Sequence, residues 1–512
     1  MKNNLTYILI AAVALGVAVT GASAYTGRAV ARRMSDQTAR IGKLVPALHL
    51  EEKVEHGLFS TKREVKVELG CVPLPSQDGT NVERTAPIKV YWRDTIHHIP
   101  FLSGQGKGIA RIDSELSIAA AGIEQLYGNR APLSVRTLVA TDGKFESDAY
   151  LAPFKAAPKA GDDLQFSGLS MHVKGKFPEG AGKFSYTGNS EPFQVNAKAE
   201  DGDFTANIGR MDLAGSVDMD PNAPSILMPY QNETKISEVS FRVSTRSEPG
   251  ATPTNMNFSL QGVTGTAESK ITKEHLWSNS NRVSGRLKTD SLEIDRFEMG
   301  SALRNLHAPT LDKLAQAWMR ESFSCDQTQT LEQSMERLEG LAKSAAALLP
   351  YNPEYQVGPI AIELAGKRAE LSYTVGTRGV AAGTPPPPIM ELVFKHGYAN
   401  AEAKLHLGLV DAFAAYAEKL SAGAAQPKHA AAPPGMPNPA ALMARGMIDG
   451  FVQQGYLVRA GETVSGRVEF EGGAVKLNGK PFDLPDLGAL GGPDMGSMMR
   501  MMGADEPADA KP

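Results

Sequence analysis

The stretch Val239-Ser-Phe-Arg-Val-Ser-Thr245 shows the pattern that decides the fold. Apolar Val239, Phe241 and Val243 alternate with polar residues, and successive side chains of a β-strand point to opposite faces of a sheet. The same alternation occurs in REVKVELG at 63–70 and in PLSVRTLV at 132–139. One apolar and one polar face per strand is typical of antiparallel sheets that are half-buried. The sequence therefore predicts an antiparallel, β-dominated α+β protein and disfavours a parallel α/β fold.

This pattern extends over most of the first 300 residues. Gly, Asn, Asp and Pro interrupt it about every 8 to 12 residues, a spacing typical of successive short strands. We found no convincing helical pattern of about 12 residues in this region. We predict one long antiparallel meander over residues 54–300.

The second half contains helical patterns. A capping box at Thr330–Gln333 opens a predicted helix that ends before Pro350. A shorter helix is predicted to start near Asp411, with Phe413, Tyr416 and Leu420 inward. Another helix is expected after Pro439, because Pro favours the first turn. Its predicted apolar face consists of Met443, Met447 and Phe451.

Two similar hairpins accompany these helices. Residues 360–375 and 466–480 each contain two alternating segments joined by a short turn with Gly. Because each follows a predicted helix, residues 301–487 are predicted to form helix-hairpin (α-β-β) units. Asn478-Gly479 is the strongest turn signal in the chain, and we predict a type I′ turn there.

The N-terminus carries a long uncharged segment. Residues 5–20 contain no charge, and the uncharged run continues to Arg28, which is about the length that a membrane-spanning helix needs. Ala22-Ser23-Ala24 also fits a signal-peptidase site. We favour an uncleaved anchor over residues 1–26, followed by a juxtamembrane segment at 27–53, because the apolar run is longer than that of most signal peptides.

Composition excludes several classes of function. Lys plus Arg total 53 and Asp plus Glu total 57, a net charge of −4 that gives no reason to expect a nucleic-acid partner. The chain contains no nucleophile-elbow, zinc-protease, Walker A or dinucleotide-binding motif in its required context. We therefore expect no catalytic residues, no cofactor and no enzyme activity.

The sequence contains few candidate metal-binding residues. His97 and His98 are adjacent, so in a strand they point to opposite faces, and a hydrogen-bonded histidine at a sheet edge is the expected role. The glycine-rich Ser103–Gly108 segment is expected to be a plain loop. The methionines near the C-terminus are suited to Cu(I), but we expect residues 488–512 to be a disordered Met-rich tail.

The sequence has two cysteines, Cys71 and Cys325. They could pair in an oxidising compartment and tie the sheet to the helical half. We favour two free or buried thiols, because the sequence alone does not place them within bridging distance.

Three short motifs, in this order, suggest a family. The first is His56-Gly57-Leu58-Phe59-Ser60-Thr61, the second is Ile96-His97-His98-Ile99-Pro100-Phe101, and the third is Leu477-Asn478-Gly479-Lys480. Together with the uncharged N-terminus they resemble the bacterial YdgA-like family of unknown function. The family has Ser where Thr61 stands and Gly where Ile99 stands. Its motif positions are matched here by Gly57, Leu58, Phe59, Ser60, His98, Pro100, Asn478 and Gly479.

The resemblance implies an inner-membrane anchor with the body in the periplasm of a Gram-negative bacterium. It implies no activity. The β-rich, once-anchored design is also similar to the AsmA-like envelope proteins, which are associated with lipid movement or outer-membrane assembly. We therefore expect an apolar sheet face or groove that binds a lipid or an envelope protein. The alternative is a scaffold that binds a protein partner through its sheet edges, without lipid.

Overall fold

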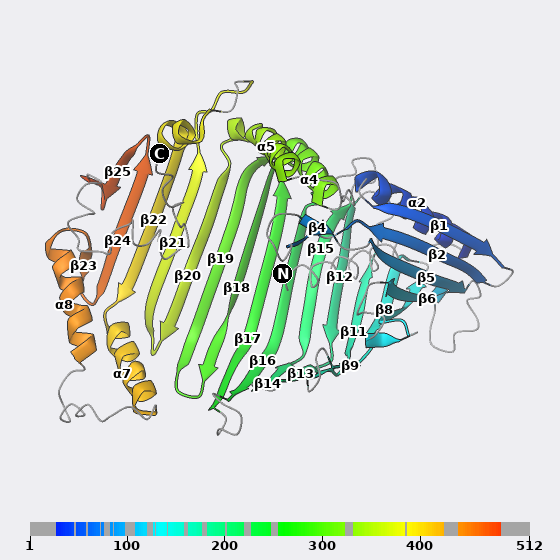
Figure 1. Ribbon diagram of the computed structural model, residues 1–512, viewed down its shortest axis with the longest axis horizontal. Coiled ribbons are helices and arrows are strands. Elements are labelled where there is room, and N and C mark those ends of the chain that lie inside the picture. Colours follow the sequence, from blue (N-terminus) through cyan, green and yellow to red (C-terminus); the bar gives the residue numbers. More distant parts are fainter. Residues whose placement is uncertain are drawn as a thin grey trace, which may run out of the picture.

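A computed structural model describes the chain from residue 27 to residue 482. The description omits 46–47, 58–59, 72, 76–81, 85–86, 98–107, 120–125, 129, 141, 158–161, 177–181, 200–201, 220–226, 247–253, 323–330, 384–386 and 424–438. Figure 1 shows that one very large sheet dominates this part of the chain, with helices at the ends of its strands.

The sheet has 24 strands, and all its pairings are antiparallel. Its first strands are β1 (His49–His56), β2 (Ser60–Leu69), β5 (Ile88–His97), β6 (Gly108–Ala119), β7 (Leu133–Ala140), β8 (Lys144–Leu151), β9 (Phe154–Ala156), β10 (Asp163–Phe166), β11 (Leu169–Lys176), β12 (Gly182–Ser190), β13 (Phe193–Ala199), β14 (Gly202–Ile208) and β15 (Met211–Met219). The sheet continues with β16 (Tyr230–Thr245), β17 (Thr254–Ile271), β18 (Leu276–Thr289), β19 (Glu293–His307), β20 (Glu354–Leu364), β21 (Lys367–Thr377), β22 (Gly397–His406), β23 (Val458–Ala460), β24 (Thr463–Glu471), β25 (Ala474–Leu477) and β26 (Lys480–Phe482). A separate small sheet pairs β3 (Pro73–Pro75) with β4 (Val82–Arg84).

Many neighbouring strands in the sheet follow one another in the sequence: β1 pairs with β2, β2 with β5 and β5 with β6. The middle strands and β22 depart from this order, because β8 pairs with β11, β10 with β13, β12 with β15 and β22 with β24. The predicted antiparallel, β-dominated fold is confirmed. The predicted change of character near residue 300 does not interrupt the sheet, because β19 runs through that residue and pairs with β20.

A crease crosses the middle strands. β8, β10, β12 and β14 each continue, after a break of two residues, into β9, β11, β13 and β15, and the partners keep one register across the break. Two of the breaks need glycine. A Cβ on Gly209 would lie 2.3 Å from Ser237 Oγ, and Gly168 has a φ of +92°. Several turn signals in the sequence therefore mark a bend within long strands rather than hairpins.

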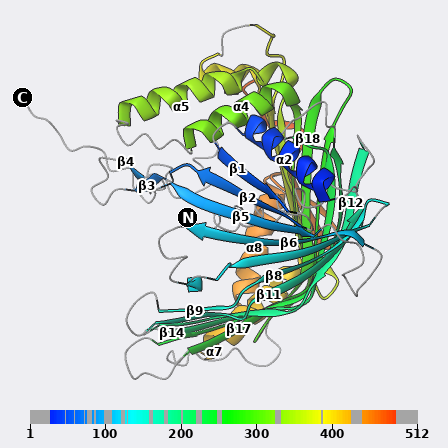
Figure 2. The same cartoon turned by 90° about the vertical axis from the view of Figure 1, so that its right-hand side faces the viewer.

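The helices sit mainly at the strand ends. They are α2 (Gly27–Leu44), α4 (Ala308–Ser322), α5 (Leu331–Ala346), the short α6 (Ile389–Glu391) with the π-helix η2 (Leu392–His396), α7 (Gly408–Gly423) and α8 (Pro439–Gln453). A 3-10 turn, η1 (Leu349–Tyr351), follows α5 and contains Pro350. Figure 2 shows a twisted, curved sheet with α2, α4 and α5 on its concave side. The predicted helices correspond to α5, α7 and α8, whereas α2 and α4 were not predicted.

The core lies under α2. Ala31 and Met34 of this helix pack with Ile96, Ile112 and Phe145 of the sheet. A second cluster around Trp92 fills the space beside it. Residues 27–53, predicted as a juxtamembrane segment, therefore form α2 and β1 of the folded body; their position relative to a membrane stays a prediction.

Two predicted segments lie outside the residues that the structure describes. No helix in the described part of the chain is long and apolar enough to cross a membrane. The predicted anchor, residues 1–26, lies outside that part, as does the predicted tail, residues 488–512.

Candidate functional site

The concave face of the sheet carries side chains in three cross-strand rows. Paired residues of neighbouring strands point to the same face, so the register defines each row. From β16 toward β24, the first row is Thr234, Gly265, Val283, Met299, Ile360, Leu371, Ala403 and Gly466. The second is Asn232, Ala267, Asn281, Ser301, Val357, Tyr373, Ala401 and Val468. The third is Tyr230, Ser269, Asn279, Leu303, Tyr355, Val375, Ala399 and Phe470.

The apolar part of these rows is open to solvent. We call it the apolar face, and its exposed members have exposed fractions between 36% for Tyr373 and 56% for Met299. A large contiguous patch of this kind is unusual on a soluble surface and typically marks a binding site. Its exposed members are Val283, Met299, Leu303, Tyr355, Leu371, Tyr373, Val375 and Val468.

The opposite face of the same strands is charged. Glu298 is buried there among Arg282, Arg296 and Arg368, with the shortest nitrogen–oxygen distance 3.3 Å. Lys404 pairs with Glu402 on β22. The usual arrangement, with apolar residues packed and polar residues in water, therefore does not hold for these strands, because their apolar side is also exposed.

The rows become polar toward β16. We call the residues Tyr230, Asn232, Ser269, Asn279, Asn281 and Ser301 the polar belt. Asn281 Nδ2 donates to Asn279 Oδ1, and Asn279 Nδ2 donates to Tyr230 Oη, both over 2.8 Å. Asn232 Oδ1 is buried and accepts no hydrogen bond within the described part of the chain. Every residue of the three rows, belt included, is uncharged.

A separate depression lies at the crease. Its volume is about 380 Å³, and Ser167, Pro192, Phe193, Asn207 and Glu238 are among its lining residues. It is wide open to solvent and does not coincide with the apolar face. We assign it no role.

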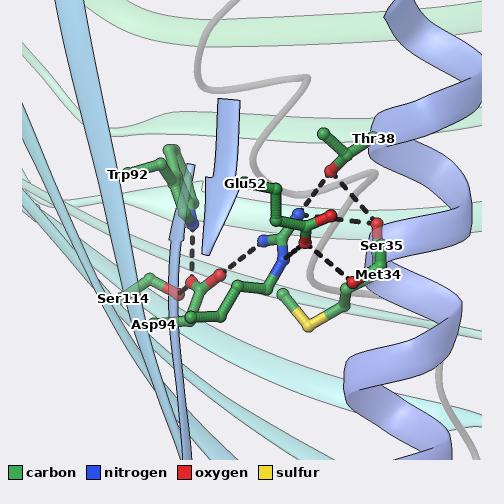
Figure 3. A network of polar contacts seen from close by, with 8 residues as sticks. Met34, Ser35, Thr38, Glu52, Trp92, Asp94 and Ser114 are labelled. Atoms are coloured by element: carbon green, nitrogen blue, oxygen red, sulfur yellow. Dashed lines mark hydrogen bonds and ion pairs between the residues drawn. The ribbon is translucent and has the colours of Figure 1, made fainter. Parts of the chain in front are cut away.

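A buried polar network joins α2 to the sheet (Figure 3). Arg63 Nη1 donates to Asp94 Oδ2 over 2.6 Å, its Nε donates to Glu52 Oε1 over 2.5 Å, and its Nη2 donates to Thr38 Oγ1. Trp92 Nε1 and Ser114 Oγ both donate to Asp94 Oδ1 over 2.6 Å. The network therefore fixes α2 on the sheet through one cation.

The charge of Asp94 is costly to bury. Desolvation raises the pKa of its carboxyl, and the positive charge of Arg63 offsets this effect only in part. The pair is sealed in the core and has no access to a ligand, so we assign it to structure.

His97 forms a hydrogen-bonded cluster at the end of β5. Its Nε2 lies 3.0 Å from Asp113 Oδ2 and 3.2 Å from Arg111 Nη2. Burial alone would raise the pKa of Asp113, but Arg136, Arg111 and His97 together lower it. His97 is hydrogen-bonded as expected, but it lies at the end of an interior strand rather than at a sheet edge, because β5 pairs with both β2 and β6. His98 and Pro100 lie outside the described residues.

The first family motif is placed at the β1–β2 connection. The backbone N–H of Gly57 donates to the carbonyl of Ser60 over 2.8 Å. A Cβ on Gly57 would lie 2.8 Å from that same oxygen, so the turn needs glycine. Leu58 and Phe59 lie outside the described residues.

The last family motif closes the β25–β26 hairpin. Asn478 and Gly479 have φ values of +51° and +79°, as the predicted type I′ turn requires. Asn478 Oδ1 accepts from the N–H of Arg467, and its Nδ2 donates to the carbonyls of Gly455 and Tyr456. This motif therefore ties the final hairpin to β24 and to the segment after α8.

The α8 helix differs from its prediction. Met443 and Met447 are 69% and 58% exposed, so the face predicted to be apolar points largely to solvent. Phe451 reaches the final hairpin indirectly, because its ring contacts Tyr456 and Tyr456 contacts Phe482.

Cys71 is buried and disulfide-bonded. Our preference for free thiols was therefore wrong for Cys71. The only other cysteine of the sequence is Cys325, which lies outside the described residues.

Sequence reasoning named none of the residues of the apolar face as site residues. Their alternation predicted strands, but a strand pattern does not tell whether its apolar side meets a core or solvent. One feature of the sequence could have indicated an exposed apolar face: it predicts too few helices to cover one side of so long a sheet.

Comparison with known proteins gives one match. The model of a family described as "Bacterial protein of unknown function (DUF945)" matches residues 1–485. No curated protein and no solved structure matches the chain.

Proposed function

This chain belongs to a bacterial protein family of unknown function, and from that premise we propose that it is a membrane-anchored periplasmic protein that binds lipid on its apolar face. The observation that carries the proposal is the exposed apolar patch on β18 to β24. From β19 to β24 it spans four strand spacings, roughly 19 Å, which suits an extended acyl chain. A bound chain would remove this surface from water, which is favourable by about 25 cal/mol per Å².

The disulfide supports the compartment. Disulfides persist in oxidising compartments, including the bacterial periplasm, and are rare in the cytosol. Cys71 is disulfide-bonded, and the uncharged run before Arg28 suits an inner-membrane anchor. We also propose that the resemblance to the YdgA-like family, and more distantly to the AsmA-like proteins, reflects a shared place in the Gram-negative envelope.

The alternative is a scaffold that binds a protein partner through a sheet edge. The charges of β1 speak against this at one edge: Glu51, Glu52, Lys53 and Glu55 lie on that strand. Charged residues on an edge strand oppose the addition of another strand. At the other edge, β23, β25 and β26 are each only three or four residues long.

A photo-crosslinking experiment separates the two functions. A photoreactive amino acid replaces Tyr373 on the apolar face of the full chain in cells. The matched control replaces Thr374, the next residue of β21, which points to the opposite face. A third variant carries the group at Lys53 on the edge strand β1.

We expect lipid adducts, seen by mass spectrometry, at position 373 and none at position 374. Protein adducts at position 53, with no lipid adduct at 373, would contradict lipid binding and support the scaffold.

A further inference from the structure

The polar belt continues directly into the apolar face. Asn279 is paired with Leu303 in the third row, and Ser301 is paired with Val357 in the second row. The belt and the apolar face therefore adjoin on one face of the sheet. An occupant of the apolar face would therefore meet amide and hydroxyl groups at one end. The belt is the part of the surface that would contact the group next to an acyl chain.

Hydrogen-bonding capacity remains in the belt. Asn279 Oδ1 and Tyr230 Oη each accept from a neighbouring amide, which leaves the Tyr230 hydroxyl hydrogen available to donate. Asn232 Oδ1 is buried with no partner in the described residues. A buried acceptor that stays unsatisfied is unfavourable, and Asn232 as a whole is only partly buried, so rotation of its amide would let a ligand donor satisfy this oxygen.

The absence of charged side chains from the three rows determines which lipid head groups the belt favours. No charged side chain occurs in the three rows, so no residue of these rows compensates an ionised head group placed against the belt. Removing an ion from water without a partner costs far more than removing a hydroxyl that keeps its hydrogen bonds. Charged residues of the strands that carry the belt, such as Arg282 and Glu298 on β18 and β19, lie on the opposite face.

We propose that the belt recognises an acyl-chain lipid whose group next to the chain is uncharged and both donates and accepts hydrogen bonds, such as a glycerol hydroxyl. This proposal rests on the proposed lipid binding and adds its specificity. An ionised carboxylate directly on the chain is disfavoured.

The test compares two lipids with the same chain. The full chain, held in an amphipathic polymer, is titrated with radiolabelled monooleoylglycerol and with oleate at pH 8. The variants are Asn232→Leu and Asn281→Leu. Asn281 is exposed, so its variant does not depend on repacking a buried site. The matched control is Gln231→Leu, because this amide precedes Asn232 on β16 and bonds to Glu268 on the opposite face.

We expect the native chain to bind monooleoylglycerol at least tenfold more tightly than oleate. Each belt variant should weaken monooleoylglycerol binding about three- to tenfold, the effect of one lost neutral hydrogen bond, and leave oleate unchanged. The Gln231→Leu control should retain the native preference.

Two results would overturn the proposal. Equal binding of both lipids, unchanged in the belt variants, would remove the selectivity and leave lipid binding intact. Binding of neither lipid would contradict the proposed function together with this inference.

Discussion

Arg63 and Asp94 form an ion pair over 2.6 Å in which neither side chain is more than 1% exposed. Removing one partner of a buried pair leaves an uncompensated charge, which costs about 3–5 kcal/mol. We predict that Arg63→Met lowers the free energy of unfolding by about this amount in urea titrations. The control is Arg93→Met, because Arg93 and Glu64 form an exposed pair on the neighbouring strands, and exposed pairs contribute about 0–1 kcal/mol. Equal losses in the two variants would contradict this account of the network.

The Asp113 cluster predicts a pH dependence. Because the folded pKa of this carboxyl is lowered, the cluster stabilises the fold above the unfolded pKa, about 3.9. The stabilisation is lost as the pH falls through the folded pKa. Asp113→Asn should therefore lower the thermal midpoint at pH 7 and show a smaller further decrease on acidification than the native chain. Parallel pH profiles for the two proteins would refute the assignment.

The β25–β26 turn needs a residue with positive φ at Gly479, so a substitution there should affect the stability of the fold. Gly479 has a φ of +79°, and a Cβ there would meet nothing within 4 Å. Gly479→Val should destabilise the fold by about 1–3 kcal/mol through backbone strain, and the folded variant should keep the proposed lipid binding. Gly446 in α8 also has free space around it, but it is helical, so Gly446→Ala should stabilise by about 0.5–1 kcal/mol. A stable Gly479→Val protein that no longer binds its ligand would identify the turn as a recognition site.

The disulfide predicts a redox-dependent stability. Loss of a native disulfide typically costs about 2–5 kcal/mol. Cys71→Ser should lower the thermal midpoint under oxidising conditions. In excess reductant the native chain and the variant should unfold at similar temperatures. A native chain unaffected by reductant would show that the bond does not stabilise the fold.

The proposed membrane anchor implies an intact N-terminus. Intact-mass analysis of membrane-extracted protein should find residues 1–24 still attached, because the uncharged run before Arg28 is long enough to span a bilayer. A mature chain that begins at Tyr25 would mean that the segment is a cleaved signal peptide.

The sequence predicted the strands well, because alternation is a local property. Val65 in β2 and Leu133 in β7 are apolar positions of the alternating pattern, and both are buried as the pattern predicts. The hairpin turns were equally local, and Ala365-Gly366 and Gly472-Gly473 both take positive φ. These features depend only on residues close together in the chain.

The features that the sequence did not predict depend on distant contacts. The α2 segment GRAVARRMSDQTARIGKL looks solvated, yet three of its residues are buried by contacts with distant elements. Ala31 and Met34 pack on the sheet, and Thr38 accepts a hydrogen bond from Arg63. The sequence pattern predicts hairpin turns at the positions of the crease. Pro153, Pro192 and Gly209 lie there, and Pro and Gly are common both in turns and in bends within a strand. Whether an apolar strand face is covered likewise depends on the whole fold.

The order of the strands has a consequence for assembly. Many strands pair with strands near them in the sequence, so many sheet contacts have a short loop to close, although β19 pairs with β20 across α4 and α5 and β22 pairs with β24 across α7 and α8. Contacts that are local in the sequence favour rapid folding, and within such runs growth can proceed strand by strand from an existing hairpin. The same arrangement lets an added or deleted pair of strands lengthen or shorten the concave face without changing the path of the remaining chain. The width of the concave face can therefore change in steps of one hairpin.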